Sequence, residues 1–319
     1  MMLVAALDRP EQLCLALVAE AALGYPAWLY RTIGHPVSWS GRAIRLVENL
    51  LNRGSAARQR LGGGLCAVLL IAAGGGVGWL AEAVLAFRYG PLIIALLATT
   101  GLAQRSLWQH VRAVARPLKE GPLANGDLNT ARTALCHVVG RDTAALDEAG
   151  ISAAAIETLA ESFCDGVVAP AFWFLLGGLP GLFAFKAVST ADSMIGHIDV
   201  RNRYFGTAAA RLDDVMNWLP ARIAALLILL AARGRGWRVL WRDHAAHASP
   251  NAGWPESAMA GALGVRLGGG AFYDAEWLAR PALGDGESPA SHNLDCALRI
   301  YLRACILLWL IAGGIAWLR

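Results

Sequence analysis

The sequence predicts an all-α, polytopic integral membrane protein with about five transmembrane helices and helical cytoplasmic loops. Hydrophobic residues make up 56% of its 319 residues and charged residues only 16%, whereas a soluble domain carries about 25% charge. The mean hydropathy is +0.44. No low-complexity linker divides the chain, so we expect one membrane domain over residues 1–319. Its polar loops are expected at residues 31–60, 105–165, 189–214 and 233–303.

The arginines indicate which loops face the cytoplasm. Residues 31–60 hold six arginines against one acid, and residues 233–303 hold eight arginines. By the positive-inside rule both loops are cytoplasmic, and we expect the bacterial inner membrane as the location. The net charge of +4 is too small and too dispersed to indicate nucleic acid. The six cysteines form no C-x-x-C pair and are expected to be reduced core residues.

The apolar runs of the first third differ in quality. Leu13–Leu29 is interrupted by Glu20, Gly24 and Pro26 and predicts a weak or half-buried span. Leu61–Phe87 is the longest run and predicts a full span, with an acid, Glu82, buried near its end. A short turn follows, and the run that ends at Leu107 predicts a second span returning inward. The two therefore form a predicted helical hairpin. No Gly-Lys-Ser/Thr follows the triple glycines of the first span, which excludes a Walker phosphate loop.

Acidic residues precede the central apolar run. If residues 153–165 are helical, as their alanine content indicates, Glu157, Glu161 and Asp165 stand at i, i+4 and i+8 on one face. Stacked like charges repel each other, so this face favours a cation such as magnesium carrying a nucleotide. A solvated acidic face is the alternative.

The central run, Val167–Val188, has 22 residues and a single charge, Lys186. That length crosses a bilayer, but Pro170 and the segment Gly177–Gly181 break or kink helices. The run therefore predicts a broken or re-entrant helix near Gly177–Gly181, or else an irregular helix packed by small residues.

Polar residues follow that run, and they create a conflict of topology. Thr190, Asp192, Ser193 and His197 indicate a polar site at the membrane boundary. Five plain spans would leave residues 189–214 on the face opposite the acids. Either the glycine break makes a re-entrant hairpin, or this segment folds back into a cavity at membrane depth.

Two arginines are candidates for binding phosphate. Arg222 lies inside the predicted span Val215–Ala232, where a charge costs about 2.5 to 3.5 kcal/mol on insertion scales. It should therefore pair with Asp213, Asp214 or a substrate phosphate. Arg141 could clamp a phosphate through its fork of donors or pair with its neighbouring aspartate.

The last loop contains a predicted anion pocket. The turn Ser249–Gly253 feeds a helix with Pro255 at its first position, and free N–H groups at such a start bind anions. Ala304–Leu318 predicts a final short span with tryptophans near its ends.

Several motifs in order give the chain a family resemblance from Glu20 to Ala282. They are HPVSWSG (35–41), ARTALCHVVGRDT (131–143), ESFCDGVVAPAFW (161–173), GGLPG (177–181), STADSMIGH (189–197), RYFGTAAARLDDVMNWLPAR (203–222) and SPNAGWPESAMAGALGV (249–265). With these motifs the chain resembles the adenosylcobinamide-phosphate synthase family, the CobD/CbiB proteins of cobalamin biosynthesis. One departure stands out: Tyr25 occupies the position where the family usually has an acid.

The resemblance implies a ligase that forms an amide bond between adenosylcobyric acid and an aminopropanol phosphate, or a related amino alcohol phosphate or phosphothreonine. ATP and magnesium would be the cofactors, with no tightly bound prosthetic group. The partners would be the corrinoid substrate, the amino alcohol phosphate and the lipid bilayer, with homo-oligomers or other cobalamin-pathway enzymes as further possibilities.

That chemistry needs carboxylates for the metal, arginines for phosphates and a base for the ammonium. We expect Glu161, Asp165 and Asp192 to hold magnesium and act in catalysis, with His197 or an acid as the base. The expected phosphate and substrate ligands are Arg141, Arg211, Arg222, Asp213, Asp214, Asn217, Ser249 and Asn251.

Two other classes are weighed against the ligase. A membrane phosphotransferase of the CDP-alcohol type is suggested by Asp165-Gly166, but Ala169-Pro170 replaces the Ala-Arg of its signature. A non-catalytic scaffold that holds corrinoid intermediates at the membrane is the second alternative.

Overall fold

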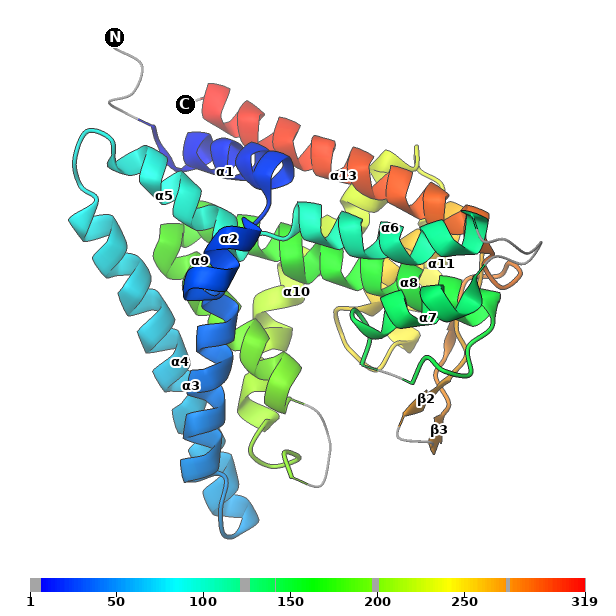
Figure 1. Ribbon diagram of the computed structural model, residues 1–319, viewed down its shortest axis with the longest axis horizontal. Coiled ribbons are helices and arrows are strands. Elements are labelled where there is room, and N and C mark those ends of the chain that lie inside the picture. Colours follow the sequence, from blue (N-terminus) through cyan, green and yellow to red (C-terminus); the bar gives the residue numbers. More distant parts are fainter. Residues whose placement is uncertain (1–6, 121–126, 141, 197–200, 274–275, 319) are drawn as a thin grey trace. The chain divides into compact units, whose positions relative to one another are not determined.

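The computed structural model describes residues 7–120, 127–140, 142–196, 201–273 and 276–318, and this part of the chain is mainly helical (Figure 1). The α-helices are α1 (Arg9–Leu23), α2 (Ala27–Ile33), α3 (Pro36–Leu51), α4 (Ala56–Val84), α5 (Gly90–Ala98), α6 (Gln104–Glu120), α7 (Leu128–Cys136), α8 (Glu148–Phe163), α9 (Ala169–Ile195), α10 (Thr207–Ala231), α11 (Trp237–Asp243), α12 (Gly253–Leu263) and α13 (Ser291–Trp317). A π-helical turn, Cys164–Val168, joins α8 to α9.

The membrane character expected from the sequence is confirmed by the lengths of the helices. Within the described residues, four helical segments are long and apolar enough to cross a membrane: Ala56–Val84, Glu148–Ile195, Thr207–Ala231 and Ser291–Trp317. The bent pair Arg9–Leu23 and Ala27–Leu51, which meets at 98°, would be a fifth. The prediction of an all-α protein with about five spans therefore holds.

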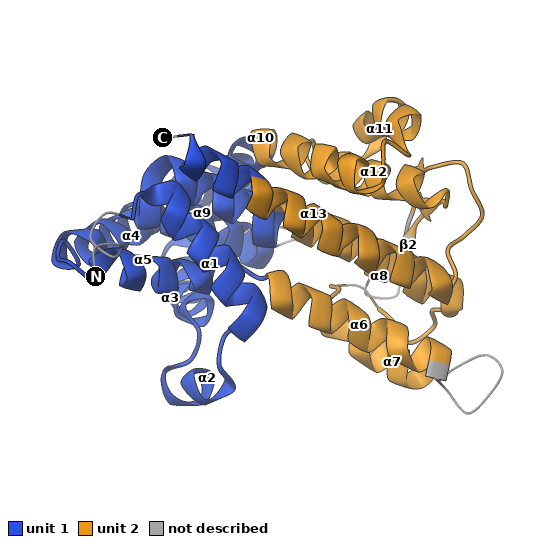
Figure 2. Cartoon of the chain, turned by 90° about the horizontal axis from the view of Figure 1, so that it is seen from above, with its two compact units in different colours: residues 1–103, 165–217, 311–319 blue, residues 104–164, 218–310 orange. Residues whose placement is uncertain are grey.

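The chain divides into two compact units that interleave along the sequence (Figure 2). Unit 1 comprises residues 1–103, 165–217 and 311–319, and unit 2 comprises residues 104–164 and 218–310. In unit 2, α6 packs against α7 and α8, and α12 packs against α8 and α11. Unit 2 also holds two small antiparallel sheets, β1 (Leu267–Gly268) with β4 (Ala282–Leu283) and β2 (Ala271–Tyr273) with β3 (Glu276–Leu278). These strands were not predicted from the sequence.

In unit 1, α4 lies along α9, and α3 packs against both. The glycines of α4 allow this approach, because a β-carbon on Gly74 would overlap the Phe183 carbonyl and one on Gly78 would overlap Pro180. Small residues let transmembrane helices pack backbone to backbone in this way. Apolar residues of α3, α4, α9 and α10, with Phe205 in the turn before α10, fill the core beside these contacts; the cluster comprises Ile44, Cys66, Leu70, Ala187, Ala191, Ile195, Phe205 and Ala209.

The predicted break in the central span is present, and the buried acid of α4 stabilises it. Gly178 interrupts α9 with φ 62° and ψ −150°, a conformation that essentially only glycine adopts. The backbone N–H of Leu179 then donates to Glu82 Oε1 at 2.8 Å. A carboxylate at the start of the second half of α9 satisfies an orphan donor and complements the helix dipole. The GGLPG motif and Glu82, far apart in sequence, therefore form one structural feature.

Two expectations about the spans are wrong. The run to Leu107 was expected to return as one helix, but α5 has nine residues and ends at Ala98, where a 3₁₀ turn, Thr99–Gly101, follows. The Ala103 N–H then bonds to the Gly166 carbonyl at 2.9 Å, so the chain turns here through backbone bonding that hydropathy does not encode. Residues 189–214 were expected to be a loop, yet α9 continues to Ile195 and α10 begins at Thr207.

Candidate functional site

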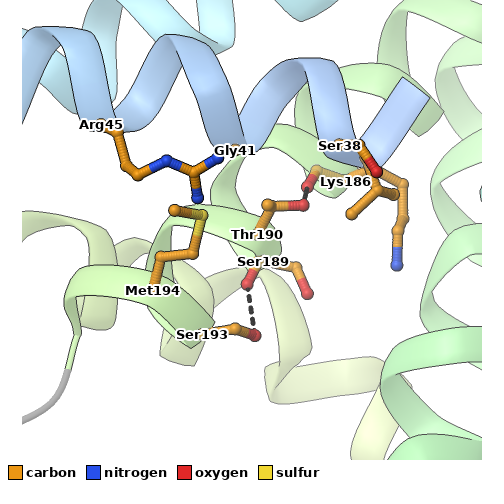
Figure 3. Close-up of a pocket in the computed structure, with 9 residues that line it drawn as sticks. Ser38, Gly41, Arg45, Lys186, Ser189, Thr190, Ser193 and Met194 are labelled. Carbon is orange, nitrogen blue, oxygen red and sulfur yellow. Dashed lines mark hydrogen bonds between the residues drawn. The ribbon is translucent and has the colours of Figure 1, made fainter. Parts of the chain in front are cut away.

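A polar pocket lies in unit 1 between α3 and α9, with a volume of about 400 Å³. Its lining is rich in hydroxyl groups and includes two cations (Figure 3). The lining residues are Val37, Ser38, Gly41 and Arg45 from α3, and Lys186, Ser189, Thr190, Ser193 and Met194 from α9. The pocket thus joins two of the motifs that carry the family resemblance, HPVSWSG and STADSMIGH.

The absence of a side chain at Gly41 allows α3 and α9 to approach closely at the pocket. A β-carbon there would lie 3.1 Å from Met194 Sδ and 3.9 Å from a terminal nitrogen of Arg45. Thr190 donates to the Lys186 carbonyl at 2.6 Å, and Ser193 donates to the Ser189 carbonyl at 2.9 Å. These two hydroxyls keep their oxygen lone pairs available but use their protons within α9.

Several acids interact electrostatically with Lys186 or with one another. The Lys186 ammonium is within electrostatic range of Asp165 and Asp213, and Asp213 is within range of Asp192. The Asn217 amide donates to Asp213 Oδ2 at 2.9 Å, whereas the buried Oδ1 atom accepts no hydrogen bond from the described residues. A buried carboxylate oxygen left in this state costs free energy unless a donor or a cation occupies the space next to it.

Other predicted residues of unit 1 lie around this acidic cluster. Arg211 pairs with Asp214 at 3.8 Å, one turn along α10. Gly196 leaves room for the Asp192 carboxylate, because a β-carbon there would overlap Asp192 Oδ1. His197 follows directly but lies outside the described residues, as does Arg141 of unit 2. Their roles stay predictions.

The predicted acidic stripe does not persist as one face. Glu157 is buried, and its Oε1 atom accepts from the Gly268 N–H of β1 at 2.8 Å, so it is a structural acceptor. Glu161 is exposed on the last turn of α8, and Asp165 lies in the π-helical turn, where the helical register changes. Within the described ranges, no three His, Cys, Asp or Glu side chains come close enough to hold a metal ion.

Arg222 lies in unit 2 and is held by protein groups. Its guanidinium donates to the Trp218 carbonyl at 2.5 Å and to Asn251 Oδ1 at 3.0 Å. The same group lies 4.4 Å from the centre of the Trp218 ring and 4.6 Å from that of Trp254. Stacking between aromatic rings is a preferred environment of arginine. The expected pairing with an acid is replaced by this amide and these two indole rings.

The turn before α12 uses its own donors. Ser249 Oγ accepts from the N–H groups of Asn251 and Ala252, both at 3.2 Å. The Ser249 N–H donates to His247 Nδ1 at 3.0 Å, and His247 Nε2 lies 3.7 Å from Glu256 Oε1. Burial, reinforced by the positive charge of Arg280, lowers the pKa of His247. The expected anion pocket at Ser249 and Asn251 is therefore occupied by a hydrogen-bonded turn.

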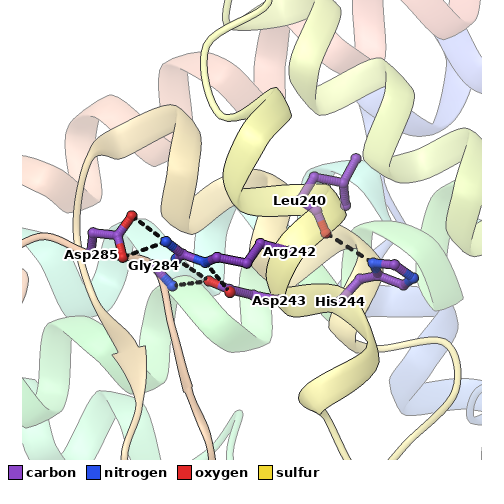
Figure 4. A network of polar contacts seen from close by, with 6 residues as sticks. All are labelled: Leu240, Arg242, Asp243, His244, Gly284 and Asp285. Atoms are coloured by element: carbon purple, nitrogen blue, oxygen red, sulfur yellow. Dashed lines mark hydrogen bonds and ion pairs between the residues drawn. The ribbon is translucent and has the colours of Figure 1, made fainter.

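A second polar network in unit 2 ties α11 to the loop after β4 (Figure 4). Arg242 forms ion pairs with Asp243 at 2.5 Å and with Asp285 at 2.6 Å, and the Gly284 N–H donates to Asp243 Oδ2 at 2.7 Å. The hydrogen bond from Arg242, supported by that from Gly284, lowers the pKa of Asp243. This network holds the loop in place and leaves little capacity for a ligand.

Sequence reasoning missed Arg45, Ser38 and Ser189 as site residues. Arg45 was counted only among the cytoplasmic arginines, and Lys186 only as the charge that ends an apolar run. The available signal was the HPVSWSG motif, which lies outside the predicted site yet supplies one wall of the pocket.

Membrane-length helices and a pocket lined by cations and hydroxyls define a polytopic helical membrane protein with a polar site. Comparison with known families makes this specific. The family model described as CobD/Cbib protein matches residues 13–301, and the chain belongs to that family.

Curated relatives resemble the chain over nearly its whole length. A cobalamin biosynthesis protein CobD of a Sinorhizobium species is 42% identical over 307 residues, covering 92% of this chain and 94% of its own. The proteins of the same description from Brucella suis and Rhodobacter capsulatus are each 43% identical; the first alignment covers 91% of both chains, and the second covers 94% of this chain and 95% of the relative. No solved structure matches the chain.

Proposed function

We propose that this protein acts in cobalamin biosynthesis as an ATP-dependent ligase, joining the carboxylate of adenosylcobyric acid to the amine of an amino alcohol phosphate. The observation that carries the proposal is the match to the CobD/Cbib family over residues 13–301, with relatives that carry the cobalamin description. The proposed location is the bacterial inner membrane with the main polar loops in the cytoplasm.

The acidic cluster beside Lys186 supports this chemistry. A carboxylate does not acylate an amine at neutral pH, so it must first be activated, most simply by phosphoryl transfer. Magnesium would neutralise the transferring phosphoryl group. The described residues offer no dedicated cage of three acidic ligands, but magnesium is usually held by one or two carboxylates and the substrate phosphates. Asp165 and Asp192, which interact electrostatically with Lys186 and Asp213 respectively, fit that mode.

The residues of the chain would then have distinct tasks. Lys186 is the cation that we assign to the phosphate of the amino alcohol phosphate. Asp213, oriented by Asn217, is the group we assign to hold the ammonium of the amine and accept its proton. Asp165 and Asp192 hold the nucleotide's metal ion, with Glu161 and His197 as further candidates for catalysis.

A turnover assay tests the proposal. The purified chain in nanodiscs is given adenosylcobyric acid, aminopropanol phosphate, ATP and magnesium, and the corrinoid product and ADP are measured together. Both should appear in equal amounts. Asp165→Asn should lower kcat by at least about 100-fold, the size of effect expected from removing a charge at the reacting groups. Binding of the corrinoid with no ADP would favour the scaffold alternative and contradict the ligase.

A further inference from the structure

We infer that the pocket between α3 and α9 binds the phosphate group of the small amine substrate, while Asp213, which has a buried carboxylate oxygen without a hydrogen bond from the described residues, receives its ammonium group. This assignment rests on the proposed function for the identity of the amine. The pocket itself is defined by geometry alone, and it places the phosphate on Arg45, Lys186 and the hydroxyls of Ser38 and Ser189.

Several hydrogen-bond donors of the pocket are not used by the described residues of the protein. Among the residues that the structure describes, none accepts a hydrogen bond from the side chains of Arg45, Ser38 or Ser189, and the Lys186 ammonium forms no ion pair within 4.0 Å. Figure 3 shows Arg45 and Lys186 on either side of Ser189 and Thr190. An anion with several oxygens can accept from both cations and from the hydroxyls together, and such charge-assisted bonds are the strong ones.

The volume and the lining of the pocket favour a small phosphate ester. Its volume of about 400 Å³ is near the lower end of the range of about 300 to 1,000 Å³ for small-molecule sites. The lining has no acid of its own, so no carboxylate repels a phosphate within it. Apart from Val37 and Met194 the lining is polar or glycine, which argues against a corrin ring or a lipid chain as the occupant.

The pocket and the nearby acids carry opposite charge. Arg45, Lys186 and the hydroxyls line the pocket, whereas Asp213 does not line it but has a buried oxygen without a hydrogen bond from the described residues and interacts electrostatically with Lys186. A short molecule with a phosphate at one end and an ammonium at the other matches this order of positive and negative groups. An amine without a phosphate would satisfy only the acids, and a phosphate without an amine only the pocket.

The test measures binding without turnover, so it is independent of the ligase assay. Aminopropanol phosphate is titrated by calorimetry into the full chain in neutral detergent, with neither ATP nor corrinoid present. We expect Arg45→Gln to raise the Kd at least about tenfold, the equivalent of about 1.4 kcal/mol, and Ser189→Ala to raise it less. The matched control is Arg42→Gln, because Arg42 is an exposed arginine of the same helix that does not line the pocket; its Kd should change less than about twofold.

Three further titrations identify the occupant. Aminopropanol without phosphate should bind wild type at least about tenfold more weakly than its phosphate ester, and Arg45→Gln should not change that weaker binding. ATP should not compete for the pocket, and neither should phosphatidylglycerol in the detergent micelle. An unchanged Kd of Arg45→Gln for aminopropanol phosphate would overturn the assignment. So would a finding that Arg45→Gln loses as much affinity for ATP, or for the anionic lipid, as it loses for aminopropanol phosphate. Binding that follows the expected pattern with no ligase turnover would uphold the pocket and reject the proposed function.

Discussion

The pocket of unit 1 and the Arg222 site of unit 2 contain the same kind of residue in opposite states. Arg222 gives its donors to Asn251 and the Trp218 carbonyl and its faces to two indole rings. Arg45 has no protein acceptor among the described residues and faces a cavity lined by hydroxyls. A charged residue at membrane depth is by default a candidate for a functional site. A sharper criterion is whether protein groups already accept the hydrogen bonds that the charged side chain can donate.

The largest expected effect comes from breaking the helix that carries the pocket. Gly178→Ala adds a β-carbon that overlaps Glu82 Oε1 in a backbone conformation with φ 62°, which costs about 3 kcal/mol or more. We expect loss of folded protein or a strongly lowered Tm, and loss of phosphate-ester binding in what remains.

The neighbouring glycine supplies the control. A β-carbon on Gly177 would meet nothing within 4 Å, so Gly177→Ala should leave the Tm and binding close to wild type. Equal tolerance of both variants would show that Glu82 does not fix the break, and the pocket would then not depend on it.

The second prediction separates the two arginines by stability. Arg222→Gln removes a charged hydrogen bond to Asn251 and two cation–π contacts, together worth about 2 kcal/mol. Its Tm should fall by several degrees, whereas Arg45→Gln, which removes no protein hydrogen bond, should change stability by less than about 0.5 kcal/mol.

Differential scanning fluorimetry and calorimetry on the same preparations check this. If Arg222→Gln kept its Tm and instead lost affinity for aminopropanol phosphate, the roles assigned to the two arginines would be reversed.

These residues show which features can be predicted from the sequence and which cannot. Hydropathy predicted the long spans, and the glycines and prolines predicted the break at Gly178, because both properties are local. That Glu82 caps the break depends on α4 lying beside α9, a tertiary contact with no local signature. Likewise, six arginines occupy residues 31–60, and only the packing of α3 on α9 selects Arg45 as a pocket residue.

The prediction of a single acidic face fails for the same reason. Glu157 follows the helical spacing of Glu161, yet burial against β1 makes it structural. The π-helical turn at Cys164–Val168 then changes the register before Asp165. A strict 3.6-residue period cannot foresee either effect. The hydrogen bond from Asn217 to Asp213 joins residues at i and i+4 on one helix, and it is a local contact that was not predicted.

The smallest expected effect is a pH dependence confined to the turn before α12. Burial keeps His247 neutral, and its pKa lies below the ordinary value of 6.5. As the pH falls below 6.5, the unfolded chain binds a proton that the folded chain excludes, so the contribution to stability is full above that pH and is lost below it. The Tm should therefore decrease between pH 7.5 and pH 5.5.

His247→Asn keeps an acceptor for the Ser249 N–H but cannot titrate, so the decrease of its Tm over this pH range should be shallower. The exposed His110 of α6 provides the control, and His110→Asn should retain the wild-type slope. His247 does not line the α3–α9 pocket, so phosphate-ester binding by His247→Asn should match wild type at pH 7.5. A change in that affinity would contradict a role of His247 confined to the turn.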